Sequence, residues 1–244
     1  MIVDRRASSE TLQVRTEEYY KSYNARRGIG RNDLLANPQV LFQFFAAEAS
    51  VVRALQSIRL DPTGAMVLDV GCGRGASLLS LLRMGFAPSN LYGVDIRPDQ
   101  IAFTRSQLPA SPIQCGDASN LEFADNTFDL VHASAMFLQV PDDVISGRIA
   151  TEMVRVAKPG AHILVSDWRY SRPGSSEFKA VDKKRIARLF LVGQRTTVRA
   201  VFSGQLIPPV GRFLSEHFPA LYFLVGAVLP ILVGRVTTVL QKIK

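Results

Sequence analysis

Cysteine is scarce in this sequence, because its 244 residues include only Cys72 and Cys115. Two thiols cannot build a disulfide framework, which excludes the small secreted proteins that depend on one. The opening residues, MIVDRRASSE, also lack the apolar run of a secretion signal. We therefore expect a protein of the reducing cytoplasm, in which both thiols serve as small apolar side chains.

Internal repeats and low-complexity tracts are absent from the sequence as well, so it indicates neither a solenoid nor a disordered chain. Its composition, 47% hydrophobic and 20% charged, supports one large domain with a buried core. Acidic residues are outnumbered, and the net charge of +8 favours an anionic partner. Nucleic acid, a membrane surface and a phosphorylated substrate all fit that charge.

Apolar runs suited to strands alternate with helical patterns, as is typical of a parallel sheet with crossover helices. The predicted helices between the strands cover 76–84, 98–107 and 142–157, and the sequence KPG ends the last one. Right-handed crossovers then give an α/β, doubly wound sheet whose carboxyl edge binds ligands. The predicted strands of this sheet cover 66–72, 91–96, 112–117, 128–134 and 162–168.

The stretch VLDVGCGRG, residues 67–75, has three glycines directly after a strand that carries an acid. Glycine suits a strand-to-helix turn at which backbone must contact a ligand. Gly71, Gly73 and Ala76 half fit the dinucleotide fingerprint. Asp69, two residues before the first glycine, would repel a pyrophosphate and attract an ammonium group.

Four motifs follow one another in order: VLDVGCGRG, LYGVDIRPD, CGDASNLEFADNTFDLV and RVAKPGAHILVSDW. Together they resemble the class I S-adenosylmethionine-dependent methyltransferases, and most of all the type 11 group, which includes quinone-biosynthesis enzymes. The resemblance covers residues 66–168. It implies a Rossmann-like, mostly parallel sheet of about seven strands with the last one antiparallel. It also implies that the turn contacts S-adenosylmethionine, through Gly71, Cys72, Gly73 and Gly75.

The resemblance assigns cofactor roles to further residues, and their chemistry suits these roles. Asp69 would lie near the methionyl ammonium group and contact it through a water, and Asp95 would accept hydrogen bonds from both ribose hydroxyls. Ile96 would lie against the adenine. Asp117 would accept from the adenine amine, and the backbone of Ala118 would donate to the ring. The alternative for the three aspartates is a turn or helix-capping role.

Candidate catalytic residues lie at the ends of the fourth and fifth strands. Methyl transfer needs a general base only when the acceptor keeps its proton near neutral pH. His132 is one candidate base, with a buried core histidine as the alternative. Asp167 is the preferred base or orienting group, while Arg169 and Tyr170 are candidates to bind substrate; a structural capping loop is the alternative for all three. The sequence indicates no metal site.

The segment after the fifth strand is unusually apolar. Strands at 196–203 and 235–243 suit the parallel sixth and antiparallel seventh strands of the family, so residues 204–234 should cover the substrate mouth as a C-terminal apolar helical insertion. Its uncharged run, 218–234, contains Pro230 and is at the short limit for a membrane span. A hydrophobic lid, a homodimer face and an interfacial helix pair remain open.

The sequence predicts two further helical segments, one before the methyltransferase domain and one beside the insertion. Residues 1–60 form an N-terminal helical segment, and the methyltransferase domain covers 61–244. In the N-terminal segment, a set of side chains would fold over the cofactor or form solvated helix surface: Tyr19, Tyr20, Arg31, Asn32 and Asp33. A basic amphipathic helix at 177–192 lies beside the insertion.

The basic helix and the apolar insertion would together form a rim suited to an amphiphile with an anionic head. We expect O-methylation of a lipid-linked or membrane-proximal glycan, with a quinone-like or other apolar metabolite as the alternative. The protein would then be cytoplasmic and peripheral at the inner face of the membrane.

Two other classes of enzyme use a similar fold. A nicotinamide oxidoreductase should lack Asp69 and carry a hydride site that the sequence does not indicate. A nucleic-acid methyltransferase suits the charge, but the chain lacks an N/D-P-P-Y type motif and a basic, aromatic platform. Nucleic acid is therefore not the expected partner.

Overall fold

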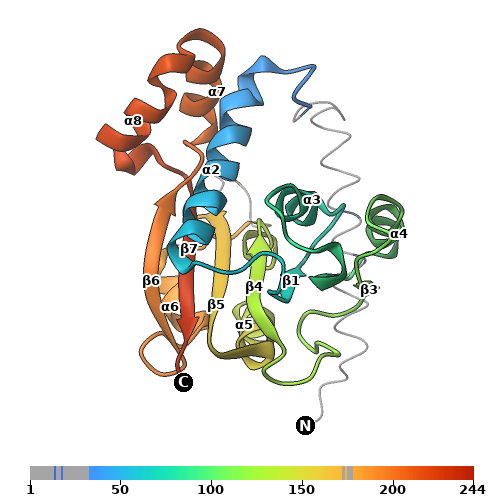
Figure 1. The fold of residues 1–244 in the computed structure, drawn as a ribbon. Helices are drawn as coiled ribbons and strands as arrows, with labels where there is room; N and C mark the ends of the chain where they lie inside the picture. Colours follow the sequence, from blue (N-terminus) through green and yellow to red (C-terminus); the bar gives the residue numbers. More distant parts are fainter. Residues whose placement is uncertain (1–13, 15–17, 19–32, 172–173, 175–177) are drawn as a thin grey trace.

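The computed structural model describes residues 14, 18, 33–171, 174 and 178–244 (Figure 1). Tyr19, Tyr20, Arg31 and Asn32, and with them most of the predicted N-terminal segment, lie outside the described residues. Asp33 is described, and its carboxylate accepts the backbone N–H groups of Leu35 and Ala36 in an exposed turn.

A seven-stranded sheet in the order β3-β2-β1-β4-β5-β7-β6 forms the centre of the molecule. The first five strands are parallel, whereas β7 runs antiparallel to both of its neighbours, β5 and β6. The predicted Rossmann-like fold and its antiparallel last strand are therefore confirmed. The strands are β1 (Val67–Val70), β2 (Leu91–Asp95), β3 (Ile113–Cys115), β4 (Phe128–Ser134), β5 (Ala157–Trp168), β6 (Thr196–Ser203) and β7 (Arg235–Lys242).

Helices cover both faces of the sheet, as expected for apolar strands that are buried on both sides. The helices α2 (Leu41–Ile58), α3 (Ala76–Arg83) and α4 (Pro98–Gln107) pack on one face. The other face is covered by α5 (Asp143–Val156) and α6 (Lys183–Leu189), whose apolar side chains join a second core cluster. Asp142 caps α5 by accepting the N–H groups of Val144 and Ile145.

Two predicted boundaries were wrong. The helix expected at 177–192 is limited to α6, because Asp182 caps it by accepting the N–H of Arg185 at 2.7 Å. The preceding residues, 178–181, are not helical, and the N–H of Val181 bonds to Trp168 O at 2.8 Å. The helix expected at 142–157 ends at Val156, before KPG as predicted, but β5 begins at Ala157 rather than at 162 and includes KPG.

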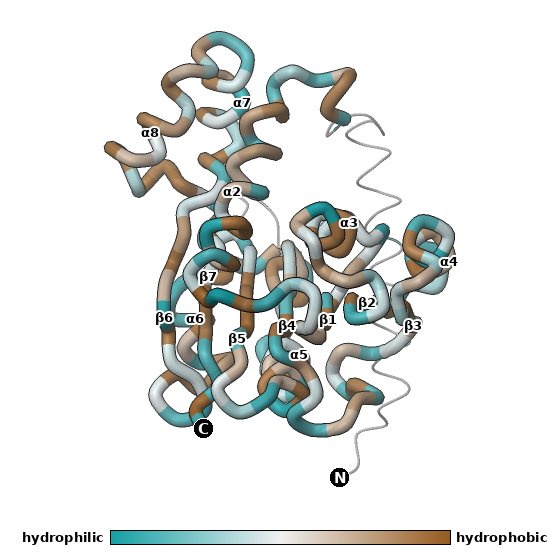
Figure 2. Tube along the Cα trace, viewed as in Figure 1, coloured by the Kyte–Doolittle hydropathy of each residue, from teal (hydrophilic) through white to brown (hydrophobic). Residues whose placement is uncertain are grey.

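Residues 204–234 leave the sheet at the end of β6 and return at the start of β7. Because β6 is parallel to β5, both ends lie at the carboxyl edge, as predicted. The segment contains α7 (Pro208–His217), α8 (Tyr222–Val228) and the short 3-10 turns η4 (Pro219–Leu221) and η5 (Pro230–Leu232). Figure 2 shows how hydrophobic α8 and its flanking turns are. No helix among the described residues is long and apolar enough to cross a membrane.

The helix α2 joins this segment to the sheet. Tyr222 of α8 donates to Gln43 Oε1 at 2.8 Å, and Ser50 of α2 shares a 2.8 Å hydrogen bond with Thr237 of β7. In Figure 1, α2 lies beside α7 and in front of β7. None of the described residues before β1 lines the pocket at the glycine turn, so the described part of the N-terminal segment that was expected to fold over the cofactor packs elsewhere.

Candidate active site

The glycine turn after β1 brings bare backbone to the carboxyl edge. The N–H groups of Gly71 and Cys72 both donate to Val94 O, at 2.8 and 3.0 Å. Gly71 has φ +71°, and a Cβ there would lie 2.7 Å from Met136 Cγ. Gly73 has φ +50°, and a Cβ there would meet nothing within 4 Å. The backbone at Gly73 is thus open to a ligand, and both positions favour glycine.

A pocket of about 310 Å³ opens beside this turn, a size within the usual range for a small-molecule site. It is bounded by the ends of β1, β2 and β4, by the residues after β3, and by the 3-10 turn η3 (Phe137–Gln139). Every predicted cofactor residue except Asp69 and Gly75 lines it, namely Gly71, Cys72, Gly73, Asp95, Ile96, Asp117 and Ala118. Residues from η3 and its flank, Met136, Gln139 and Val140, complete one wall and were not predicted.

Asp95, the last residue of β2, presents a carboxylate to the pocket. Its Oδ2 accepts the N–H of Gly73 at 2.9 Å, and its Oδ1 accepts the N–H of Arg97 at 3.0 Å. Each oxygen therefore keeps acceptor capacity for a ligand. Burial raises the pKa of Asp95, and these backbone donors oppose the rise. Asp117 also lines the pocket, where its Oδ1 accepts the N–H of Ser119 at 2.8 Å in a turn.

Asp69 is buried behind the turn and bonded to His132. The two residues are register partners on β1 and β4, and Asp69 Oδ1 lies 2.9 Å from His132 Nδ1. His132 is also buried, and its Nε2 has no hydrogen-bond partner among the described residues. Asp69 still acts on the pocket, because its charge adds to the rise that burial causes in the pKa of both Cys72 and Asp95.

Asp167 lies away from this pair. It stands three residues beyond Leu164, the register partner of His132, so the two candidate bases occupy opposite faces of the sheet. The Asp167 carboxylate is buried and accepts the N–H groups of Leu138 and Trp168, at 3.1 and 2.8 Å. Burial raises its pKa to about 6. Neither Asp167 nor His132 lines the pocket.

Arg169 and Tyr170, the predicted substrate residues, hold the apolar segment. Arg169 Nε donates to Val233 O at 2.6 Å, and its Nη2 donates to Pro230 O. The Tyr170 hydroxyl donates to Ile231 O at 2.8 Å. In this structure, both side chains fix the turn η5 to the carboxyl end of β5.

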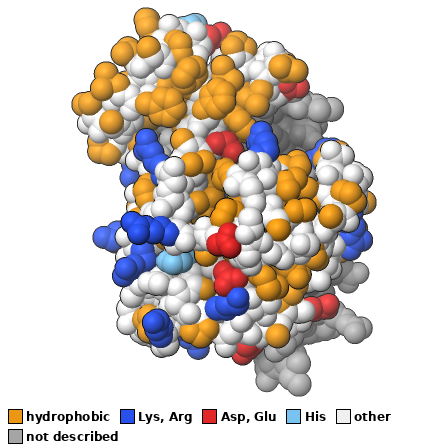
Figure 3. Space-filling view, in the orientation of Figure 1, with side chains coloured by type: hydrophobic (Ala, Val, Ile, Leu, Met, Phe, Trp, Pro, Cys, Tyr) orange, Lys and Arg blue, Asp and Glu red, His pale blue; other side chains and the backbone are white. Residues whose placement is uncertain are grey.

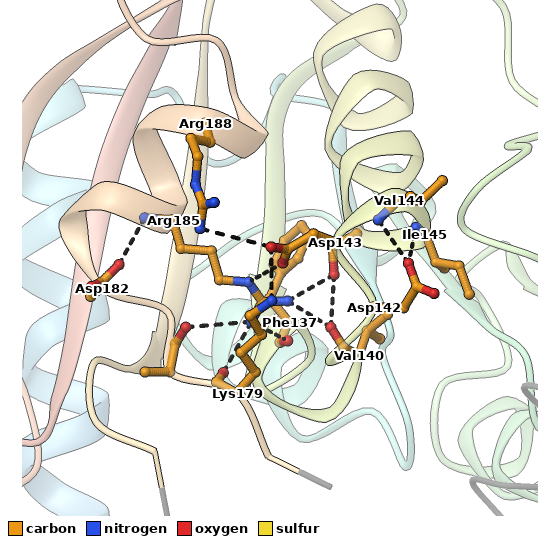
Figure 4. Close-up of polar contacts among 12 residues, drawn as sticks. Phe137, Val140, Asp142, Asp143, Val144, Ile145, Lys179, Asp182, Arg185 and Arg188 are labelled. Carbon is orange, nitrogen blue, oxygen red and sulfur yellow. Dashed lines mark hydrogen bonds and ion pairs between the residues drawn. The ribbon is translucent and has the colours of Figure 1, made fainter. Parts of the chain in front are cut away.

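Arg185 of α6 is a buried cation that was not predicted from the sequence, and its side chain links α6 to η3 and α5 (Figure 4). Its guanidinium donates to the carbonyls of Val140 and Phe137, at 2.6 and 3.0 Å, and pairs with Asp143 at 3.1 Å. Arg185 thereby anchors η3, which forms one wall of the pocket. The sequence carried a signal for it, since position 185 is four residues from both Val181 and Leu189 in the apolar stripe.

Comparison with known proteins agrees with this geometry. Residues 68–165 match the family model described as a methyltransferase domain. The chain carries a class I S-adenosylmethionine-dependent methyltransferase domain. The methyltransferase domain coincides with the strands and turns that form the pocket.

Curated relatives share this domain. The 2-methyl-6-phytyl-1,4-hydroquinone methyltransferase of Synechocystis sp. is 34% identical over 139 residues, covering 54% of this chain and 42% of the relative. The phthiotriol/phenolphthiotriol dimycocerosates methyltransferase of Mycobacterium leprae is 35% identical over 118 residues, covering 46% and 41%. The matches thus span about two fifths of the length of these relatives.

Solved structures extend the likeness to most of the fold. A S-adenosylmethionine-dependent methyltransferase from Methanosarcina mazei aligns with a TM-score of 0.55 and 19% identity, over 78% of this chain and 97% of that one. At this identity the likeness establishes the fold alone.

Proposed function

We propose that this protein is a S-adenosylmethionine-dependent methyltransferase acting on an apolar acceptor. The observation that carries the proposal is one pocket in which the open backbone at Gly73 and the carboxylate of Asp95 lie side by side, bonded at 2.9 Å. A ligand with a ribose diol and a cationic end fits both features. The cofactor supplies the activated methyl group, and the chain supplies binding, orientation and exclusion of water.

The pocket residues that were predicted to bind the cofactor have the following roles in this proposal. Asp95 accepts hydrogen bonds from the ribose hydroxyls, and Ile96 lies against the adenine. Asp117 accepts from the adenine amine, and the backbone of Ala118 donates to the ring. Gly71, Cys72 and Gly73 let the backbone approach the methionyl part closely.

Asp69 acts in this proposal from behind the glycine turn, through its field. Its effect on the pKa values of Cys72 and Asp95 indicates a negative potential in the pocket. Such a potential favours the ammonium and sulfonium groups of S-adenosylmethionine and opposes a pyrophosphate. This argues against the nicotinamide alternative.

The acceptor is an apolar molecule in this proposal, because the carboxyl edge carries an apolar lobe, defined here as residues 204–234. Eight large apolar side chains of the lobe are exposed, and Figure 3 shows apolar groups gathered over α7 and α8: Phe213, Phe218, Leu221, Phe223, Leu224, Val228, Leu229 and Ile231. The two curated relatives are named for a phytylated hydroquinone and for dimycocerosate lipids. These names favour a quinol or lipid acceptor over the lipid-linked glycan expected first.

The same lobe supports the proposal that the protein contacts the inner face of a membrane. Exposed apolar surface on this scale marks an interaction site, and a net charge of +8 favours anionic lipid. Two short helices flanked by proline-containing turns suit insertion at the interface. The alternative is that a second copy of the chain covers the lobe in a homodimer.

Calorimetry with S-adenosylmethionine and NADH tests the cofactor. We expect micromolar binding of the former and none of the latter; the reverse result would overturn the proposal. Transfer of a labelled methyl group to extracted membrane lipids, separated into quinol, fatty-acid and glycolipid fractions, then identifies the acceptor. Label in the glycolipid fraction alone would restore the glycan interpretation.

A further inference from the structure

Arg235, the first residue of β7, lies where the pocket and the apolar lobe meet. It pairs with Trp168 at the carboxyl end of β5, and it follows directly on the lobe. Its Nη2 donates to Ser134 Oγ at 2.6 Å. Ser134 ends β4 and lines the pocket, so a single side chain separates the guanidinium from the cofactor site.

The guanidinium of Arg235 has unused donors. An arginine offers five N–H groups. Apart from Ser134, its acceptors are Ser166 O and Gln205 Oε1, both at a weak 3.4 Å. Within the described part of the chain, its Nε has no acceptor. These donors are available to a ligand.

Arg235 also has no ion-pair partner among the described residues. No carboxylate oxygen of the described residues lies within 4.0 Å of its guanidinium. Burial lowers the pKa of Arg235, and the charges of Asp167 and Glu48 only partly oppose that effect. Asp167 is engaged by two backbone N–H groups. Glu48 accepts from Ser80, whose hydroxyl is also bonded by Arg83. A partly buried cation without a counterion is costly, and an anionic ligand would relieve that cost.

The residues around Arg235 indicate which kind of chemical group is attached to the anion. Val236, the next residue, packs on the lobe cluster formed by Leu206, Val233 and Tyr222. The ligand therefore meets an apolar surface on one side of the guanidinium and the cofactor pocket on the other.

We propose that Arg235 and Ser134 form an acceptor subsite that binds an acidic oxygen, a carboxylate, phosphate or acidic phenol, attached to an apolar chain. This rests on the proposed function, and it narrows the apolar acceptor to an acidic amphiphile. An acceptor that reaches the site already deprotonated needs no general base, which is consistent with both candidate bases lying outside the pocket.

Binding of chain-matched probes tests the subsite. Dodecanoate, dodecyl phosphate and dodecanol are titrated into the full chain by calorimetry, with and without S-adenosylhomocysteine. We expect both anions to bind at least tenfold more tightly than dodecanol, and Arg235→Gln to lose about tenfold to a hundredfold of anion affinity while dodecanol binding changes little. Arg199→Gln, the same change at an exposed arginine of β6, is the matched control and should keep the preference.

An Arg235→Gln variant that folds and keeps the wild-type preference overturns the subsite, as does equal binding of all three probes to wild type. A second measurement needs no folded Gln variant. The Nε–H resonance of Arg235 in wild type, assigned by its loss in Arg235→Lys, should move downfield with dodecanoate and not with dodecanol. An unmoved resonance overturns the subsite. If S-adenosylmethionine does not bind, the proposed function is refuted instead. The titrations of the three probes without cofactor still test the subsite separately.

Discussion

Asp69 and His132 face each other across β1 and β4 and share a buried hydrogen bond of 2.9 Å. His132→Leu removes the partner of a buried carboxylate, so we expect a loss of about 1–3 kcal/mol in the free energy of unfolding, measured by urea denaturation. The double variant Asp69→Leu/His132→Leu removes both groups. It should be destabilised by less than the sum of the single changes, and additive losses would contradict the pairing.

In the proposed function Asp95 accepts hydrogen bonds from the cofactor ribose, so Asp95→Ala should weaken S-adenosylmethionine binding by roughly 2–3 kcal/mol, the scale of hydrogen bonds to a charged group. The change also removes the acceptor of the Gly73 N–H, which loosens the turn. Calorimetry measures the affinity. Asp99→Ala, a nearby acid in the first turn of α4, is the control and should bind normally. Unchanged affinity in a folded Asp95→Ala protein would place the cofactor elsewhere.

The strands and the glycine turn after β1 could be predicted from the sequence, because both depend on local patterns. Apolar runs of four to eight residues marked the strands, and the glycines marked positions that require positive φ, such as Gly71. Burial of single polar groups depends on distant contacts. The partners of Arg185 on η3 and α5 are 39 to 48 residues away in the sequence. Its charge therefore indicated a solvent-exposed side chain, while its position in the apolar stripe indicated a buried one.

The same limit applies to Arg169 and Tyr170. Their position at the end of β5 was predicted, but their partners are carbonyl oxygens 61 and 64 residues further along the chain. Carbonyl acceptors leave no trace in side-chain composition. For this reason the sequence indicated a ligand for these two side chains, whereas their contacts in the structure are to the backbone of the lobe.

The exposed apolar lobe should bind lipid. Leu224 and Leu229 are 56% and 48% exposed, so Leu224→Gln with Leu229→Gln removes apolar contact without opening the core. We expect weaker flotation with vesicles of phosphatidylglycerol and phosphatidylcholine, and unchanged S-adenosylmethionine affinity. The same double change should leave the mass in solution unaltered. Conversion of a wild-type dimer to monomer would instead identify the lobe as a dimer face.

Asp167 should make stability depend on pH. Its folded pKa of about 6 exceeds the usual value near 4, so the native state holds this proton more tightly than the unfolded chain does. The contribution is complete below pH 4 and is lost as the pH rises through 6. For this group alone, the loss is roughly 3 kcal/mol. Urea denaturation between pH 4 and 7 should show that fall in wild type, and Asp167→Asn should lack it.

Asp167 was the general base preferred from the sequence, and its hydrogen bond to the N–H of Leu138 in η3 gives a competing role in shaping the pocket. Asn keeps an oxygen that can accept this N–H but cannot take a proton, whereas Ala removes both properties. A base predicts that Asp167→Asn lowers kcat by about 10²- to 10⁴-fold, with cofactor affinity near wild type. A positioning role predicts near-normal kcat for Asn and a loss only for Ala. Should Asp167→Asn keep full rate while His132→Gln loses it, the base lies on β4. Full activity in both variants would mean that proximity alone drives the transfer to an acceptor that is already nucleophilic, which is consistent with a deprotonated acceptor at the Arg235 subsite.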